Sequence, residues 1–452
     1  MSRLFLKLLV FCFMMLFNPV LYAEVTFQEW TTPKKIHAIL VPDSSTQLVS
    51  VHFSFKAAGS RSDPKGKEGL ATLMTQLLLE RTLPGSDRHT LQKNLRSLGV
   101  IHGFQYSVDA DNINFWFKCP KEKIKPVFDI IKMIITTPDF DQKELAKSKN
   151  FDPADSRLST SGEQEFAGKI LIQKLLLSHP YAIPSTGTLE GRQAITLDDL
   201  KTAARDRFAR DNLVFSVVGD LSAQMLTEYL DNTFEALPET ANLPLIANAD
   251  IKSLGEKIFI PKETPQSGVV FGQAGLTVQN KDYLALLIIN DILGGKPFTS
   301  RLWLEAREKQ GSVYSIYTDL LNWQFASLLI GGFECDNKVV DNVIQAVRHE
   351  WQDIQEKGIS EAEFKASKTG LLGSFVLMFS TPDGIAQYLL NCYLNNLPVN
   401  YINERNALLS KVTLADVNHV AKTILKPEQL TFVIVGKSEG NTDLKPTIKP
   451  EV

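Results

Sequence analysis

The chain has 452 residues, of which 44% are hydrophobic, and its formal net charge at neutral pH is −3. A chain of this length and composition can bury more than one core, so we expect two or three domains. The small net charge and the lack of a polybasic stripe argue against a nucleic-acid-binding surface. The composition is typical of neither a disordered nor a collagen-like chain.

The first 23 residues have the pattern of a secretory signal peptide. Arg3 and Lys7 supply positive charge, an apolar run covers residues 8–17, and the small residue Ala23 offers a cleavage site. A membrane anchor is the alternative, but a spanning helix needs about 20 apolar residues, which this run does not provide. We expect residues 1–23 to be removed and the mature chain to contain no membrane span.

Three cysteines stay in the mature chain, far apart in the sequence: Cys119, Cys335 and Cys392. No Cys-x-x-Cys occurs, so neither a cysteine zinc site nor a redox pair is indicated. We expect buried free thiols, with one disulfide as the alternative.

An internal repeat organises the chain. The segment from Thr196 to Gly219 resembles the segment from Thr413 to Gly436, which lies 217 residues further on. Each segment begins with Thr-Leu, continues as a predicted helix and ends in an apolar run before glycine. Residues 55–59 match residues 271–275 at an offset of 216. Two matches at nearly one offset predict a duplicated domain.

The two copies are expected at residues 30–237 and 253–440, joined by a proline-containing linker at residues 237–244. Each copy opens with strands, continues through a helix and further strands, and then has several helices in a row before its last strand. This order predicts an α+β fold with two homologous sandwich domains, each an antiparallel-rich sheet covered by helices. The first helices are expected at residues 69–81 and 283–293.

The helix expected at residues 69–81 carries the first informative motif. It follows Gly59-Ser60-Arg61, begins with Gly-Leu-Ala and contains Thr72, Thr75 and Gln76. This stretch resembles the first motif of the pitrilysin and insulinase-type (inverzincin) zinc peptidases, in which Gly-Leu-Ala leads into His-x-x-Glu-His. In that family the two histidines bind zinc and the glutamate takes a proton from the metal-bound water.

Thr72, Thr75 and Gln76 stand where the family has the first histidine, the glutamate and the second histidine. Their neutral side chains are weak zinc ligands, so a role as part of a buried helix face is favoured over metal binding. The family's third ligand is a glutamate on a later helix, and the corresponding stretch here offers Asp152 and Asp155. No two of the seven histidines are three or four residues apart, so no replacement zinc site is indicated.

A second motif lies in the second copy. Gly294-Gly295 is followed by Ser300-Arg301-Leu302 and then by a run from Arg307 to Tyr314. The run resembles the family pattern Arg-Glu-Lys-x-Gly-x-x-Tyr, whose arginine and tyrosine bind substrate backbone and help to stabilise the tetrahedral intermediate. Arg307 and Tyr314 match that pair, and a guanidinium and a phenol are suitable donors to a peptide carbonyl or oxyanion.

The alternative for these two residues is structural. Arg307 would then pair with Glu305 or Glu308 at the end of a helix, and Tyr314 would pack against its neighbours. Arg301 is expected to be structural, paired with a carboxylate at the seam between the domains.

The resemblance covers about residues 30–440 and implies a half-clam that pairs with a second chain to close a chamber. We therefore expect a non-catalytic subunit, a pseudoenzyme, of a heterodimeric zinc metallopeptidase. It would bind no cofactor itself and would contribute peptide binding through Arg307 and Tyr314. Its partner would be a homologous subunit that carries an intact zinc site, and homodimer formation is left open.

The family's paired members with such signals are mostly from bacteria with two membranes, so the periplasm is the expected location, with extracellular release as the alternative. Two other functions stay open. One is a stand-alone peptide-binding or assembly protein, as in the respiratory core subunits that resemble this family. The other is an active metalloendopeptidase with an atypical site.

Overall fold

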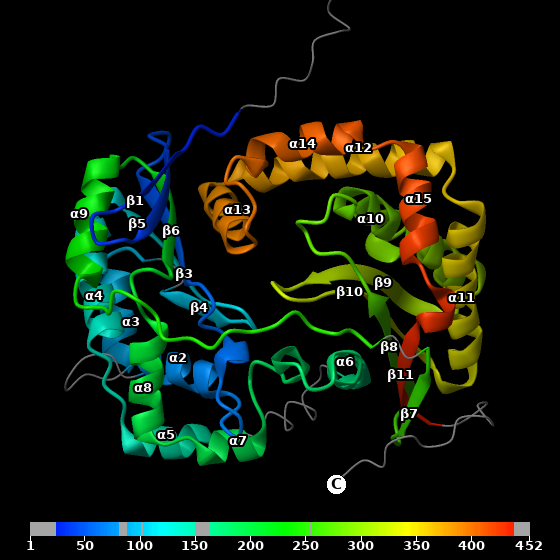
Figure 1. Ribbon diagram of the computed structural model, residues 1–452, viewed down its shortest axis with the longest axis horizontal. Coiled ribbons are helices and arrows are strands. Elements are labelled where there is room, and N and C mark those ends of the chain that lie inside the picture. Colours follow the sequence, from blue (N-terminus) through cyan, green and yellow to red (C-terminus); the bar gives the residue numbers. More distant parts are fainter. Residues whose placement is uncertain (1–23, 81–87, 101–102, 150–161, 253–254, 438–452) are drawn as a thin grey trace, which may run out of the picture.

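The computed structural model describes residues 24–80, 88–100, 103–149, 162–252 and 255–437, and the expected signal at residues 1–23 lies outside them. It contains two β-sheets, one in each half of the chain, with helices packed against both (Figure 1). The structure therefore confirms the predicted α+β class. No helix in these ranges is long and apolar enough to cross a bilayer.

The first sheet has six strands in the order β1-β2-β6-β3-β5-β4. β2 and β6 are parallel, whereas every other neighbouring pair is antiparallel. The strands are β1 (Gln28–Thr31), β2 (His37–Pro42), β3 (Leu48–Phe55), β4 (Gln105–Val108), β5 (Ile113–Pro120) and β6 (Leu213–Gly219).

The second sheet repeats this arrangement with five strands in the order β7-β11-β8-β10-β9. When β1 is set aside, the two sheets have equivalent strand orders, and β7 and β11 form the corresponding parallel pair. The strands are β7 (Lys257–Pro261), β8 (Gln266–Ala274), β9 (Val313–Asn322), β10 (Ser327–Asp336) and β11 (Thr431–Gly436).

Helices of each half cover one face of its sheet and enclose a separate apolar core. The helices of the N-terminal half are α2 (Leu70–Glu80), α3 (Arg88–Ser97), α4 (Ile124–Thr136), α5 (Gln142–Lys149), α6 (Gly162–Leu176), α7 (Leu189–Ala194), α8 (Leu197–Arg207) and α9 (Ala223–Phe234). Those of the C-terminal half are α10 (Tyr283–Asn290), α11 (Val340–Lys357), α12 (Glu361–Leu377), α13 (Pro382–Leu394), α14 (Tyr401–Lys411) and α15 (Leu414–Ile424).

Two helices are exchanged between the halves. α6 follows the strands β1–β5 of the first half, yet its apolar stripe of Ala167, Leu171 and Leu175 packs on the second sheet. α13 belongs to the second half, yet its Ala386 and Leu389 pack on the first sheet. β6 is consequently covered on both faces and is buried at every position, which explains why it reads as a continuous apolar run.

The repeat is visible in local detail as well as in topology. Thr196 begins α8 with a capping box in which its hydroxyl and the Asp199 carboxylate exchange hydrogen bonds with the backbone. Thr413 and Asp416 form the same box at the start of α15, 217 residues later. Such boxes satisfy backbone N–H groups that have no partner within the helix. The same sequence feature therefore starts the same helix twice.

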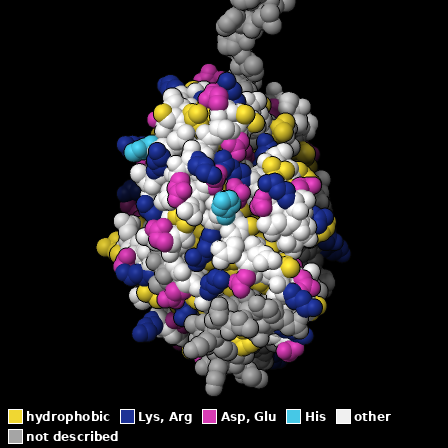
Figure 2. Space-filling view, turned by 90° about the vertical axis from the view of Figure 1, so that its right-hand side faces the viewer, with side chains coloured by type: hydrophobic (Ala, Val, Ile, Leu, Met, Phe, Trp, Pro, Cys, Tyr) yellow, Lys and Arg dark blue, Asp and Glu magenta, His cyan; other side chains and the backbone are white. Residues whose placement is uncertain are grey.

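The segment between the halves, from residue 237 to residue 252, contains neither helix nor strand. It runs along both halves: the backbone N–H of Ala249 bonds to Phe325, and that of Lys252 bonds to Leu175. On the face formed by the second half, basic and acidic side chains are interspersed and apolar side chains are scattered (Figure 2). That face shows no single-sign charged patch of the kind that nucleic acid requires.

Candidate functional site

The start of α2 is held by a buried ion pair. Arg207 donates to the Asp63 carboxylate at 2.7 Å and to the carbonyl of Gly59 at 2.8 Å. Asp63 in turn accepts hydrogen bonds from the backbone N–H groups of Gly69 and Ala71, at 2.9 and 3.0 Å. A carboxylate in this position satisfies unpaired N–H groups and stabilises the positive end of the helix. These hydrogen bonds fix the start of α2, the helix that carries the first motif.

The motif side chains on that helix do not fit a zinc ion. Thr75 is 0% exposed and its hydroxyl donates to the carbonyl of Ala71 at 2.8 Å. Thr72 is half-buried and donates to the carbonyl of Ser185 at 2.6 Å, and Gln76 is half-buried one turn further along. Both hydroxyl protons are directed to backbone oxygens, so the groups are neutral donors rather than anionic ligands.

No alternative metal site replaces it in the part of the chain that the structure describes, where no three His, Cys, Asp or Glu side chains converge. Asp152 and Asp155, the acids considered for the third ligand, lie outside the described residues. The three cysteines are buried free thiols, and burial raises the pKa of Cys119, Cys335 and Cys392 to about 12. They therefore stay protonated, and a thiolate ligand is not available at neutral pH.

Arg307 and Tyr314 are brought together at the edge of the second sheet. Arg307 lies in a π-helical turn, Trp303–Lys309, and donates to the carbonyl of Val313 at 3.1 Å. Its guanidinium carbon lies 5.3 Å from the centre of the Tyr314 ring. Tyr314 follows Val313, the first residue of β9, and is 82% exposed.

This geometry leaves most of the donors free to bind another molecule. A guanidinium has five N–H donors, and one of them is used by Val313. The cation–π contact with Tyr314 fixes the planar group without using those donors. β9 is also an edge strand, whose outer backbone groups can pair with an added peptide strand. The pair and the strand together present donors suited to a peptide backbone.

The structural alternative for Arg307 takes a different form from the one expected. Glu305 pairs with Lys309 at 2.7 Å, and within the described residues Arg307 makes no ion pair. Tyr314 projects outward instead of packing into the core. α2 and β9 belong to different halves of the molecule, so the motif residues of α2 and the Arg307–Tyr314 pair form two separate groups (Figure 1).

Arg301 is structural, but the expected location was wrong. It donates to Glu363 at 2.7 Å and to Asp353 at 2.9 Å, and both carboxylates belong to the second half. Burial pushes the pKa of Glu363 upward, yet the hydrogen bonds from Arg301 and Ser360 hold it at about 2. Arg301 therefore joins α11 and α12 within one half rather than the two halves across a seam.

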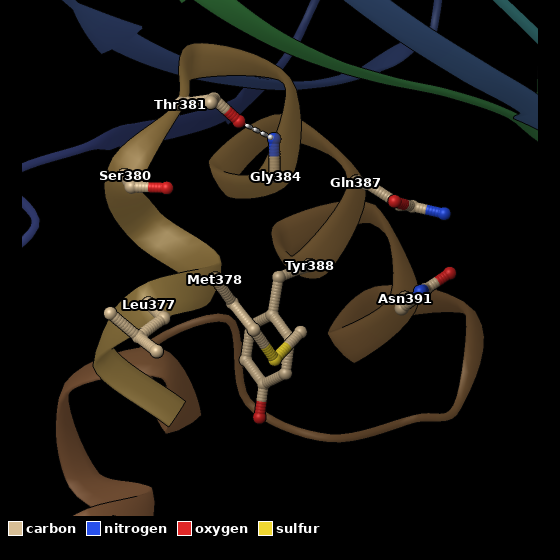
Figure 3. A pocket seen from close by; sticks show the side chains of 8 residues that line it. All are labelled: Leu377, Met378, Ser380, Thr381, Gly384, Gln387, Tyr388 and Asn391. Atoms are coloured by element: carbon tan, nitrogen blue, oxygen red, sulfur yellow. Dashed lines mark hydrogen bonds between the residues drawn. The ribbon is translucent and has the colours of Figure 1, made fainter. Parts of the chain in front are cut away.

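A pocketed region between α12 and α13 carries no recognisable sequence motif. A pocket of about 420 Å³ is lined by residues from the end of α12, the following turn Met378–Ser380 and α13. Figure 3 shows Leu377 and Met378 on the same side as Tyr388, whereas Gln387 and Asn391 extend away from them. Leu377 is 72% exposed, which is unusual for so large an apolar side chain. No spacing pattern in the sequence marks these residues.

Two family models match the chain. The model for insulinase (peptidase family M16) matches residues 38–170, and the model for the peptidase M16 inactive domain matches residues 194–371. The chain belongs to the M16 family of peptidases and their inactive homologues. Both halves of the repeat are therefore accounted for by one family.

Among relatives of similar length, some are named as non-peptidase homologues and others as zinc proteases. A non-peptidase homologue from Helicobacter pylori, YmxG, is 26% identical over 96% of this chain and 99% of its own length. A Bacillus subtilis protein named an uncharacterized zinc protease is 22% identical over 90% of this chain and 98% of its own length. The peptidase M16 inactive domain of Pseudomonas fluorescens superposes with a TM-score of 0.85 at 24% identity, covering 93% of this chain and 100% of its own.

These matches confirm the resemblance stated from the sequence. The lack of a fitting donor set at Thr72, Thr75 and Gln76 agrees with the similarity to the non-peptidase and inactive homologues. The protein is thus an M16-family homologue of the non-peptidase kind.

Proposed function

We propose that this chain is the non-catalytic subunit of an exported, heterodimeric zinc peptidase and that it binds peptide through Arg307 and Tyr314. The observation that carries the proposal is the contrast between the two motif regions. The first has a rigid frame without metal ligands, whereas the second presents an oriented arginine beside an exposed tyrosine. Zinc would be held by the partner subunit, and assembly would take place in the periplasm.

The chemistry of the pair suits a backbone carbonyl or a developing oxyanion. An arginine held in place before substrate arrives stabilises negative charge without the cost of reorganising in the transition state. The exposed phenol of Tyr314, whose ring centre lies 5.3 Å from the Arg307 guanidinium carbon, is a second donor beside it. Neither residue can activate water, so the pair assists catalysis only when a partner supplies the metal centre.

Relatives that are named as subunits support an assembled form. The beta subunit of the mitochondrial-processing peptidase of Dictyostelium discoideum is 19% identical over 84% of this chain and 82% of its own length. A chain of complex III from Candida albicans superposes with a TM-score of 0.74 at 17% identity, covering 92% of this chain and 97% of its own. Both names describe components of larger assemblies.

The test mixes the purified protein with a homologue from the same organism that carries an intact His-x-x-Glu-His motif. We expect co-purification and faster hydrolysis of a fluorogenic peptide than with the homologue alone. Arg307→Ala should lower the rate of the mixture by at least about tenfold, and Tyr314→Phe should lower it by less. Arg205→Ala, which breaks an exposed pair with Asp206, is the matched control and should change nothing.

The other outcomes separate the alternatives. If the two proteins co-purify without faster hydrolysis, and Arg307→Ala has no effect, a stand-alone peptide-binding or assembly protein would be favoured. Stoichiometric zinc and chelator-sensitive cleavage by the purified chain alone would instead identify an active metalloendopeptidase. Mature protein from the periplasm that begins at Glu24 would support the expected signal cleavage.

A further inference from the structure

A second pocket, with a volume of about 240 Å³, lies between α10, α12, α13 and α14. Its wall combines apolar side chains, including Leu284 and Leu287, with a cationic group, Arg405, and the phenols of three tyrosines. At this volume, the pocket is large enough for a small organic molecule.

Arg405 is a buried cation that lacks an anionic partner in the described part of the chain. It is 8% exposed, and its guanidinium donates to the carbonyl of Leu371 and to the Asn406 side chain, both at 3.0 Å. The face of the group lies 4.5 Å from the Phe375 ring centre. Both hydrogen-bond partners are neutral, so its charge is not compensated there.

Three other arginines with little exposed surface have carboxylate partners. Arg61 pairs with Asp111, Arg207 with Asp63, and Arg301 with three carboxylates. Taking a charge out of water without an opposite charge is costly, and proteins seldom do so without a function. The lack of a carboxylate beside Arg405 in the described chain therefore indicates an anionic ligand rather than a purely structural role.

The tyrosines complete the donor set. Tyr283, Tyr388 and Tyr401 line the pocket with Arg405, and burial raises the pKa of Tyr283 to about 12 and raises the pKa of the other two as well. All three hydroxyls stay protonated, but that of Tyr388 bonds to the Cys392 thiol, so Tyr283 and Tyr401 are the donors available to a ligand. The hydroxyl of Tyr283 accepts a bond from Asn322 at 3.3 Å, which leaves its proton for another acceptor.

We propose that this pocket binds an organic monocarboxylate with a compact apolar body. The carboxylate would accept hydrogen bonds from the free N–H groups of Arg405 and from a tyrosine hydroxyl. The apolar body of the ligand would lie against Leu284 and Leu287. A planar guanidinium matches a carboxylate in two parallel hydrogen bonds. One buried positive charge compensates one negative charge, which favours a monocarboxylate over a phosphate dianion. The proposal requires neither a partner subunit nor zinc.

The carboxylate could belong to a free acid or to the C-terminal residue of a peptide. The 420 Å³ pocket in Figure 3 is adjacent and shares Met378, Tyr388 and Asn391 with this one. It offers space for the chain that would precede a C-terminal residue. The two sources share the same chemistry at Arg405, and they are distinguished by what binds beyond it.

Isothermal titration calorimetry on the purified protein tests the proposal with butyrate, benzoate and N-acetyl-leucine, each beside its uncharged amide. We expect saturable binding of the acids, with each amide at least about tenfold weaker, because it loses the charge-assisted hydrogen bonds. Tighter binding of N-acetyl-leucine than of butyrate would identify a peptide C-terminus, and the reverse order a free acid. Equal affinities for acids and amides, or no acid binding at about 10 mM, would overturn the proposal.

Single-residue variants test whether the acids bind in this pocket. Arg405→Met, similar in length but neutral, should abolish acid binding, and Tyr401→Phe should weaken it several-fold while keeping the ring. Arg348→Met, at a different arginine that stacks on Phe432, should bind acids as the wild type does. A folded Arg405→Met variant with unchanged acid affinity would rule out this site. If that variant does not fold, Tyr401→Phe and the acid–amide comparison still decide the question.

Discussion

Asp383, at the start of α13 in the second half, lies 3.0 Å from Nε2 of His52 in β3 of the first half. The same carboxylate accepts a bond from the Ser50 hydroxyl at 3.0 Å and lies 3.3 Å from Nζ of Lys118. The exchanged helix α13 is thus fixed to the first sheet by a polar contact at its N-terminus as well as by its apolar face. Two halves related by duplication are in this way joined into one unit.

Removing this contact should destabilise the whole protein. Asp383→Ala leaves the nearly buried His52 ring and the Ser50 hydroxyl without their acceptor. We expect the free energy of unfolding, measured by urea denaturation, to fall by about 1–3 kcal/mol. Asp129→Ala is the control, because Asp129 makes an exposed pair with Lys125 that should contribute less than about 0.5 kcal/mol. Equal effects of the two variants would mean that the contact does not fix α13.

The same histidine should make stability depend on pH. Burial lowers the pKa of His52 below its ordinary value of 6.5, against the opposing influence of Asp383 and together with that of Lys118. The unfolded chain then takes up a proton at a higher pH than the folded chain does. Stability is therefore lost as the pH falls below about 6.5 and is fully present above that value.

The measurement compares wild type with His52→Gln between about pH 8 and pH 5. The difference in unfolding free energy isolates the contribution of this one group from other titrations. We expect the advantage of the wild type to shrink toward low pH. An advantage that grows instead would show that the pairing with Asp383 outweighs burial and raises the pKa of His52.

Much of the fold could be predicted from local patterns, but the exchange of helices could not. The repeat of Thr-x-x-Asp boxes and apolar runs indicates the same unit twice, because capping and strand burial are decided within a few residues. The spacing of Ala167, Leu171 and Leu175 predicts one apolar helix face, but it does not say which sheet that face covers. That choice depends on the path of the chain between the halves.

The candidate functional residues also differ in whether the sequence reveals them. Arg307 and Tyr314 are recognisable because they lie seven residues apart in a motif, and local structure brings them together. Arg405 has no neighbours in sequence that mark it. Its significance arises from tyrosines on three different helices and from the lack of a nearby carboxylate in the described chain. Such a property exists only after the helices have packed.

The two capping boxes offer a matched test of the repeat. Thr196→Ala and Thr413→Ala each remove the hydroxyl that satisfies a backbone N–H at the start of α8 or α15. Each should lower the unfolding free energy by about 1 kcal/mol in denaturation experiments. Thr423→Ala, an exposed change within α15 where the hydroxyl bonds only to its own helix, should be nearly neutral. A large effect at only one box would argue against equivalent roles.

The two arginines of the second motif should behave differently. Arg301→Ala leaves the partly buried carboxylates of Glu363 and Asp353 without their cationic partner. It should lower the free energy of unfolding by about 2–4 kcal/mol. Arg307→Ala removes one bond to a backbone carbonyl and a contact with an exposed ring, and it should cost less than about 1 kcal/mol. Thermal or urea unfolding checks both variants. Comparable losses would assign Arg307 a structural role and weaken its proposed part in peptide binding.

Restoring the family motif should not restore a zinc site. The variant Thr72→His, Thr75→Glu, Gln76→His would place a carboxylate where Thr75 is 0% exposed. It would also replace the hydroxyl that bonds to Ser185. A buried, unpaired carboxylate typically costs several kcal/mol, so we expect a markedly lower melting temperature and less than stoichiometric zinc by metal analysis. Thr75→Val, which keeps the shape and loses only a bond within α2, is the control and should leave the melting temperature almost unchanged. Stoichiometric zinc in a stable triple variant would contradict this expectation and show that the surroundings of α2 can still hold a metal.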